Sequence, residues 1–119
     1  MATYILHNCY LTFNVSLHNV GLFFFLPTGT NFGQGVYFAR DASYAVRYAG
    51  AGSEGRSVYL SRVLVGKYCA GKAEMKVPPP KDPSRPEILY ESVVDDTGNP
   101  SIFVVFHDTQ CYPEYLITF

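Results

Sequence analysis

Polar and apolar residues alternate along residues 5–17, before any charged side chain occurs. The odd-numbered positions of this segment are mostly apolar and the even-numbered positions are mostly polar. The apolar residues are Ile5, Cys9, Leu11, Phe13, Val15 and Leu17, interrupted by His7. Because successive side chains of a strand point to opposite faces, this pattern predicts a half-buried strand or hairpin.

A short strand followed by a helix is predicted next. Residues 34–39, QGVYFA, have the composition of a strand. Asp41 is a suitable N-cap, and apolar residues then recur at helical spacing. These are Ala42, Ala45, Val46 and Ala49. We expect Gly50 and Gly52 to end this helix.

The rest of the chain predicts further strands around one stiff loop. Residues 57–66 are rich in Val and Leu between two glycines, which favours a strand. Residues 77–86 contain five prolines, which neither a helix nor a central strand tolerates. Residues 101–108 predict a buried central strand. We expect Pro113 to interrupt the chain before a last strand at 115–119. The predicted fold class is α+β, mainly β, with one short helix.

Composition narrows the class of protein. A chain of 119 residues suffices for one domain with a real core. Its net charge of −1 offers no basic surface for a nucleic-acid backbone. The three cysteines, Cys9, Cys69 and Cys111, are too scattered for a metal site or a disulfide framework, so we expect reduced thiols and no metal.

The sequence also argues against a membrane or targeting segment. The densest apolar run, VGLFFFL at 20–26, is far shorter than the ~20 residues that span a bilayer. The first 39 residues contain no Lys or Arg, whereas a signal peptide begins with positive charge.

Two glycines and two tyrosines form the first candidate site. Gly33 and Gly35 allow close backbone approach, although a Gly-x-Gly by itself indicates only a tight turn. It lacks the third glycine and the acidic residue of a dinucleotide fingerprint. Tyr37 on the strand and Tyr48 at the end of the helix could form two walls of a slot for a flat heteroaromatic ring. The alternative is aromatic packing in the core.

Several separated motifs then occur in an order that resembles a known family. GQGVYFA, a helix ending in tyrosine, SVYLSRVLVGKY, a proline-rich loop and NPSIFVVFHDTQCYPEYLITF resemble the poly(ADP-ribose) polymerase catalytic domain, in particular its mono-ADP-ribosylating, macrodomain-bearing branch. The resemblance covers residues 28–119, so we predict a non-matching apolar leader at 1–27 and the C-terminal part of a catalytic domain after it. It implies a partial ADP-ribosyltransferase fold of split antiparallel β-sheets, with the helix after the GxGxYF strand.

The resemblance also implies a site for NAD+ as substrate. Tyr37 and Tyr48 match the two tyrosines on either side of the nicotinamide. Gly35 and Phe38 match the strand that frames the pocket. Ala45 stands where relatives often have a serine that bonds the nicotinamide amide, so one hydrogen bond of about 1 kcal/mol is missing.

Ile102 falls on the third motif position, which is a glutamate in the enzymes that make polymers. A carboxylate there orients the ribose and activates an incoming ADP-ribose hydroxyl, and Ile102 has no acceptor with which to do either. The resemblance therefore implies transfer of a single ADP-ribose to a protein side chain.

The family's first motif, His-Gly-Ser/Thr, is absent. His7 and His18 are the histidines upstream of Gly33, and neither precedes a glycine. We therefore expect the chain, as a truncated domain, to bind NAD+ weakly and transfer little. The alternative is a catalytically dead remnant of the NAD+ site that acts as a binding or scaffold module. A third reading, a small β-barrel or sandwich that binds a partner through exposed tyrosines, does not account for the long C-terminal match.

The implied partners are NAD+ and acceptor proteins, with the loop from Lys72 to Asn99 facing the acceptor. The nucleus is favoured slightly over the cytoplasm. We expect His107 to satisfy a backbone group or to face water, and Glu114 to be exposed. Asp95 and Asp96 are adjacent, so on an extended strand they point opposite ways and do not form a paired-carboxylate site.

Overall fold

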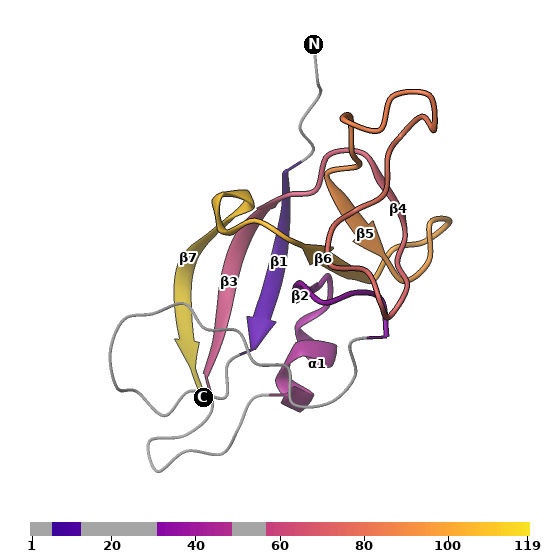
Figure 1. Cartoon of the computed structure of the whole chain (residues 1–119). Helices are drawn as coiled ribbons and strands as arrows, with labels where there is room; N and C mark the ends of the chain where they lie inside the picture. Colours follow the sequence, from indigo (N-terminus) through magenta and orange to yellow (C-terminus); the bar gives the residue numbers. More distant parts are fainter. Residues whose placement is uncertain (1–5, 13–30, 49–56) are drawn as a thin grey trace.

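The computed structural model describes residues 6–12, 31–48 and 57–119, and these ranges form strands with one short α-helix (Figure 1). This confirms the predicted mainly β fold. The strands are β1 (Leu6–Thr12), β2 (Val36–Ala39), β3 (Ser57–Leu64), β4 (Tyr68–Ala70), β5 (Ser92–Val94), β6 (Ile102–Val105) and β7 (Cys111–Thr118). The helical segments are α1 (Ala42–Ala45) and the 3-10 turns η1 (Val46–Tyr48) and η2 (Asp108–Gln110).

The strands follow the order β4-β5-β6-β2-β1-β3-β7. All neighbours are antiparallel except β4 and β5. β1 pairs with β3 along seven residues, but it meets β2 through the single pair Tyr10 and Ala39. The sheet is therefore nearly divided into two parts, β4-β5-β6-β2 and β1-β3-β7, which Figure 1 shows side by side.

Two apolar clusters occupy opposite faces of β2, β5 and β6. On one face, Phe38, Val94, Phe103 and Val105 pack with Val63 and Val65. On the other face, Ala39, Val93, Ile102 and Val104 pack with Ala45 of α1. Alternate residues of each strand belong to alternate clusters, as the two-residue period of a strand requires. We call the second surface the Tyr37 face, because Tyr37 packs against its cluster.

The predicted helix forms, but without the predicted cap. Asp41 occupies the N-cap position and makes no side-chain capping bond. Its carboxylate instead lies 3.3 Å from Arg40 Nη2, while its backbone carbonyl accepts the amides of Tyr44 and Ala45. The predicted helix end at Gly50 and Gly52 lies outside the described residues.

The prediction that Pro113 interrupts the chain was wrong. β7 continues through Pro113, because this strand stands at the end of the strand order and a missing N–H is tolerated at an edge. The register opposite Pro113 shifts between Leu60 and Ser61, so a bulge accommodates the ring.

Two short strands were missed, because each has three residues. β5 lies inside the segment 72–99, for which the sequence predicts a loop, and all three of its residues are buried. The proline-rich segment 77–86 contains no named strand or helix, as predicted. No helix among the described residues is long and apolar enough to cross a membrane.

Candidate functional site

Tyr37 is the second residue of β2, and its half-buried ring packs on the Tyr37 face. The hydroxyl donates to the carbonyl of Gly33 at 2.6 Å and accepts the amide of Phe32 at 3.1 Å. Burial raises the pKa of Tyr37, and these two backbone hydrogen bonds oppose the rise only in part. The hydroxyl is therefore protonated at neutral pH and fastens the Gly-x-Gly segment to the strand that follows it.

The two glycines approach the protein's own chain. A Cβ on Gly35 would lie 2.5 Å from the carbonyl oxygen of Val105, and one on Gly33 would lie 3.0 Å from Cζ of Phe106. Gly33 also has a φ of +142°, which side-chain-bearing residues rarely adopt. The amide of Gln34, between them, donates to Met75 O at 2.7 Å. Close packing on β6 thus accounts for Gly35, and the positive φ of Gly33 with its contact to Phe106 accounts for Gly33, so neither glycine needs a ligand to explain it.

Ile102 begins β6, opposite Ala39 of β2, and is 6% exposed within the apolar cluster of the Tyr37 face. The carboxylate nearest to it in the hydrogen-bond network is Asp95. The Asp95 oxygens accept the amides of Ser101 and Ile102, each at 3.0 Å, and the Ser101 hydroxyl at 2.6 Å. Burial alone would raise the pKa of Asp95, but these hydrogen bonds outweigh it and lower the pKa. Asp95 is thus ionised and anchors the backbone at the start of β6.

The structure brings three of the six predicted residues to one face. Tyr37, Ala45 and Ile102 all belong to the Tyr37 face. Gly35 precedes β2 at its edge. Phe38 is 1% exposed on the opposite face, where it packs with Phe103, so only its backbone lies beside Tyr37. The backbone of Tyr48 ends η1, and its side chain lies outside the described part of the chain.

Three apolar side chains around Tyr37 were not singled out from the sequence. Phe32, Met75 and Phe106 are half-buried and pack on the same cluster. Phe106 has the parity of Ile102 and Val104, so the alternation of β6 could have identified it. Met75 comes from a distant loop, and no local pattern indicates its position.

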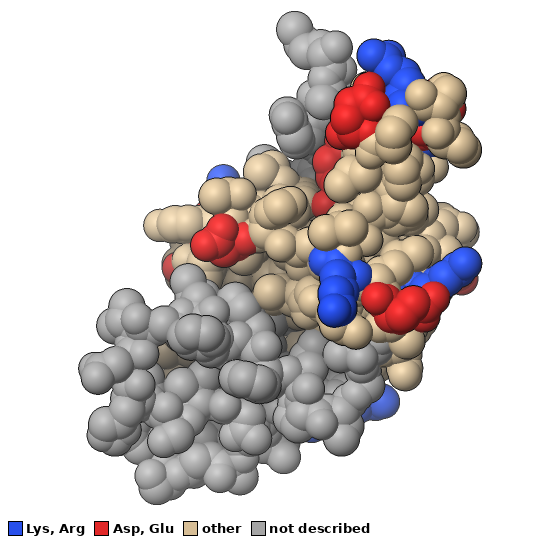
Figure 2. Space-filling model, in the orientation of Figure 1, with Lys and Arg blue, Asp and Glu red and all other residues tan. Residues whose placement is uncertain are grey.

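Outside these apolar surfaces, charged side chains are mixed in sign. Figure 2 shows Lys and Arg close to Asp and Glu on the visible face. Glu114, which we expected to be exposed, is half-buried and lies 2.6 Å from Arg62 Nε. The described residues hold no group of three His, Cys, Asp or Glu that could bind a metal. Cys69 and Cys111 are free thiols.

The described residues form a nearly divided β-sheet with one short helix, and an aromatic face lies beside the Gly-x-Gly segment. This is the α+β, mainly β class of domain that the sequence predicts. The family described as the poly(ADP-ribose) polymerase catalytic domain matches residues 5–119. This chain belongs to that family. The match begins inside the segment 1–27 that we separated as a leader, and β1 of that segment lies between β2 and β3 in the sheet.

Relatives with curated names agree with the family. The chain is 47% identical over 91 residues to protein mono-ADP-ribosyltransferase PARP14 of Homo sapiens, covering 74% of this chain and 5% of that protein. It is 44% identical over 111 residues to protein mono-ADP-ribosyltransferase PARP11 of Mus musculus, covering 76% and 33%. The chain thus spans at most a third of the length of these relatives.

A solved structure supports the fold. The PARP domain of Arabidopsis RADICAL-INDUCED CELL DEATH1 superposes with a TM-score of 0.70 at 18% identity, covering 93% of this chain and 65% of that chain. At this identity the likeness shows the fold alone.

Proposed function

We propose that the Tyr37 face is the nicotinamide side of an NAD+-dependent ADP-ribosyltransferase site, and that transfer stops after one ADP-ribose. The proposal is supported by family membership and by relatives whose names state mono-ADP-ribosyl transfer. It places the nicotinamide ring on Tyr37, which its two backbone hydrogen bonds hold in one orientation. Stacking on a fixed ring loses little side-chain entropy.

In the proposed reaction, the glycosidic bond between the ribose C1′ and the nicotinamide nitrogen breaks, and nicotinamide leaves with the bonding electrons. An acceptor carboxylate of a protein then forms a bond from its oxygen to C1′, so no proton has to be removed. The transition state is oxocarbenium-like, which a second carboxylate could stabilise. The described cluster of the Tyr37 face is apolar, and the nearby Asp95 carboxylate already accepts three hydrogen bonds from residues 101 and 102.

The proposal that only one ADP-ribose is transferred is supported by the burial of Ile102 in an apolar cluster. Elongation needs a base that activates a hydroxyl of the ADP-ribose already attached. An aliphatic side chain surrounded by Ala39, Val104 and Ala45 provides neither a base nor room for water. A protein carboxylate, which is already ionised, needs no such base.

Radiolabelled NAD+ incubated with the 119-residue chain and an acidic acceptor protein tests the proposal. We expect one discrete labelled band, which the Tyr37→Ala variant loses and the Tyr112→Ala variant retains, since Tyr112 is 68% exposed on β7. A ladder of products would contradict single transfer. Equal labelling by the two variants would contradict the role of Tyr37.

A second candidate function, NAD+ or ADP-ribose binding without turnover, is favoured by the position of His7. β1 contains no glycine, and its register sets Tyr10 opposite Ala39. If this antiparallel register continues, position 12 lies opposite Tyr37. His7 is five residues away from that position, or about 17 Å along the strand. The backbone thus places this histidine far from the Tyr37 ring.

Isothermal titration of the chain with NAD+ separates the two candidates. We expect weak binding, with a dissociation constant well above the micromolar range, because the chain lacks the His-Gly-Ser/Thr motif and the hydrogen bond missing at Ala45. Saturable binding of any affinity together with labelled product would support the enzyme. Saturable binding without product would support the binding module, and micromolar binding would contradict the weak affinity expected here.

A further inference from the structure

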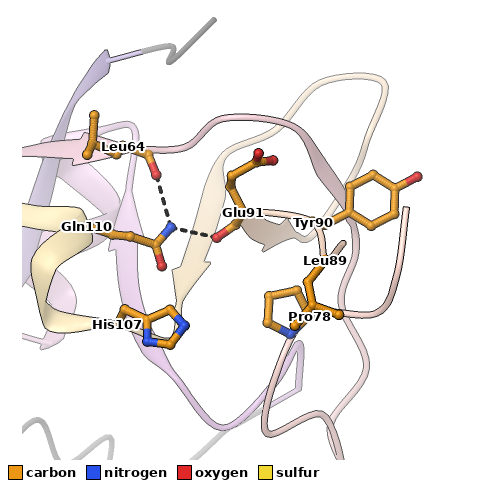
Figure 3. A pocket seen from close by; sticks show the side chains of 7 residues that line it. All are labelled: Leu64, Pro78, Leu89, Tyr90, Glu91, His107 and Gln110. Atoms are coloured by element: carbon orange, nitrogen blue, oxygen red, sulfur yellow. Dashed lines mark hydrogen bonds between the residues drawn. The ribbon is translucent and has the colours of Figure 1, made fainter. Parts of the chain in front are cut away.

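A cavity of about 220 Å³ lies where the end of β3, the segment before β5 and η2 come together. None of the six predicted site residues lines it. Its lining residues are Leu64, Pro78, Leu89, Tyr90, Glu91, His107 and Gln110 (Figure 3). The cavity is therefore separate from the Tyr37 face, and nothing in the proposed transfer reaction uses it.

The size of the cavity limits what it could hold. Pockets for drug-sized ligands and cofactors enclose roughly 300–1,000 Å³, so a dinucleotide does not fit here. An apolar cavity of about 150 Å³ accommodates benzene. A volume of about 220 Å³ thus suits one ring or a fused pair of rings.

Most of the lining surface is apolar, with polar groups from Glu91, His107 and Gln110, and its two sides face each other. Figure 3 shows His107 and Gln110 on one side, and Pro78, Leu89 and Tyr90 on the other. Such a slot between two walls from different segments favours a flat ligand over a branched aliphatic one.

The charged group at the cavity is already neutralised. The carboxylate of Glu91 accepts the amide of Lys67 at 2.8 Å and Nζ of Lys81 at 2.7 Å. With both oxygens in use, Glu91 offers no free charge to a cation. The cavity therefore suits a neutral ligand rather than a charged one.

Gln110 provides one unused hydrogen-bond acceptor. Its Nε2 donates to the carbonyls of Leu64 at 3.2 Å and Glu91 at 2.6 Å, which fixes the orientation of the carboxamide because both partners are acceptors. Its Oε1 is buried and has no hydrogen-bond partner. In Figure 3 this oxygen points toward His107, whose side chain is exposed.

We propose that this cavity binds a small neutral aromatic ring with a single N–H donor, of the type of indole. The ring lies between Pro78 and Leu89 on one side and the Gln110 side on the other. The donor reaches Gln110 Oε1 when the imidazole of His107 rotates aside, and exposed side chains change rotamer within nanoseconds. A buried acceptor without a partner is unfavourable, so a ligand that supplies a donor relieves that penalty.

Titration of the isotope-labelled 119-residue chain with indole and with N-methylindole, followed by NMR, tests the proposal. We expect saturable shifts of the Gln110 side-chain amide and the Leu89 methyl groups, with a Kd of about 0.1–10 mM for so small a ligand. N-methylindole has the same ring without the donor and should bind about five- to tenfold more weakly. Equal affinities would overturn the proposal, as would the absence of saturable shifts, which would mean that the cavity holds water only.

A pair of variants locates the binding. Leu89→Arg places a long charged chain in the cavity and should abolish the shifts. Ile88→Arg adds the same charge to the neighbouring exposed residue and should leave them unchanged. Indole binding that persists in Leu89→Arg would contradict this site. The comparison of the two ligands uses the unmodified chain, so it decides the proposal even if Leu89→Arg fails to fold.

Discussion

Tyr37 shows how one side chain can serve both the fold and the proposed site. Its hydroxyl bonds the Gly33 carbonyl and the Phe32 amide, and its ring contributes to the apolar cluster of the Tyr37 face. Replacement by phenylalanine removes the hydroxyl and keeps the ring, so it separates the two roles.

We predict that Tyr37→Phe lowers the free energy of unfolding by about 1–2 kcal/mol, because two hydrogen bonds are lost and the buried Gly33 keeps an unpaired carbonyl. The loss should be visible in urea unfolding of the chain. The matched variant Tyr112→Phe removes an exposed hydroxyl and should change stability by less than about 0.5 kcal/mol. Equal effects of the two variants would show that the hydroxyl of Tyr37 does not fasten the loop.

Asp95 is the second residue for which the structure makes a quantitative prediction. Asp95→Ala removes three hydrogen bonds at the start of β6 and should cost about 1–3 kcal/mol at neutral pH. Asp96→Ala, its exposed neighbour, loses one bond to the amide of Gly98 and should cost less than about 1 kcal/mol.

The cost of Asp95→Ala should depend on pH. Because the pKa of Asp95 is lowered in the folded state from its ordinary 3.8, its contribution to stability is present above the unfolded pKa. It is lost as the pH falls through the folded pKa. Unfolding of both proteins from pH 7 down to pH 2 measures this. A difference that stays constant over that range would contradict an ionised anchor.

At the scale of elements, the contact between β2 and β6 determines which residues can stand in the Gly-x-Gly segment. A Cβ on Gly35 would also meet Cγ1 of Val104 at 2.8 Å, so the strands would have to separate. Gly35 is thus required by strand packing, whether or not a ligand is present.

We predict that Gly35→Ala lowers stability by about 1–3 kcal/mol through overpacking. Gly98→Ala is the matched control, because its added Cβ would meet only Asp96 Oδ1 at an ordinary 3.4 Å. Thermal unfolding followed by circular dichroism gives the comparison. A wild-type midpoint for Gly35→Ala would mean that β2 and β6 are not packed this closely.

The elements also show where a sequence pattern suffices. β2, β3 and β6 were predicted from local composition. A strand that is buried on both faces has a run of apolar residues, and a strand between glycines has marked ends, so the local sequence predicts both. β4 and β5 were missed because three residues are too few for a period. Pro113 misled the prediction because only the position of β7 at an edge makes a proline acceptable there.

At the scale of the whole molecule, β7 leaves apolar side chains exposed along the end of the sheet. Tyr112, Tyr115, Leu116, Ile117 and Phe119 are all exposed. Edge strands with an apolar surface are common sites of self-association.

We predict that the chain associates at concentrations of about 100 µM and above, and that Leu116→Lys reduces this association by adding charge to the edge. Val77→Lys provides the control, because Val77 has the same 56% exposure as Leu116 but lies in the proline-rich segment. Sedimentation velocity over a concentration series measures both. A monomeric unmodified chain, or equal effects of the two lysines, would contradict a role for β7.

The sequence by itself determined the mainly β class, the short helix after the glycine segment and the family, because these depend on local alternation and on motifs in order. It also predicted Tyr37, Ala45 and Ile102 as site residues, and the fold brings these three to one face. Only the tertiary structure decided that Phe38 faces the opposite cluster, that Met75 and Phe106 pack on the same cluster as Tyr37, and that Gly33 and Gly35 contact the chain itself. The physical reason is that these contacts join residues as far apart in the sequence as Gly33 and Phe106. Which residues meet depends on strand register, which no local pattern contains.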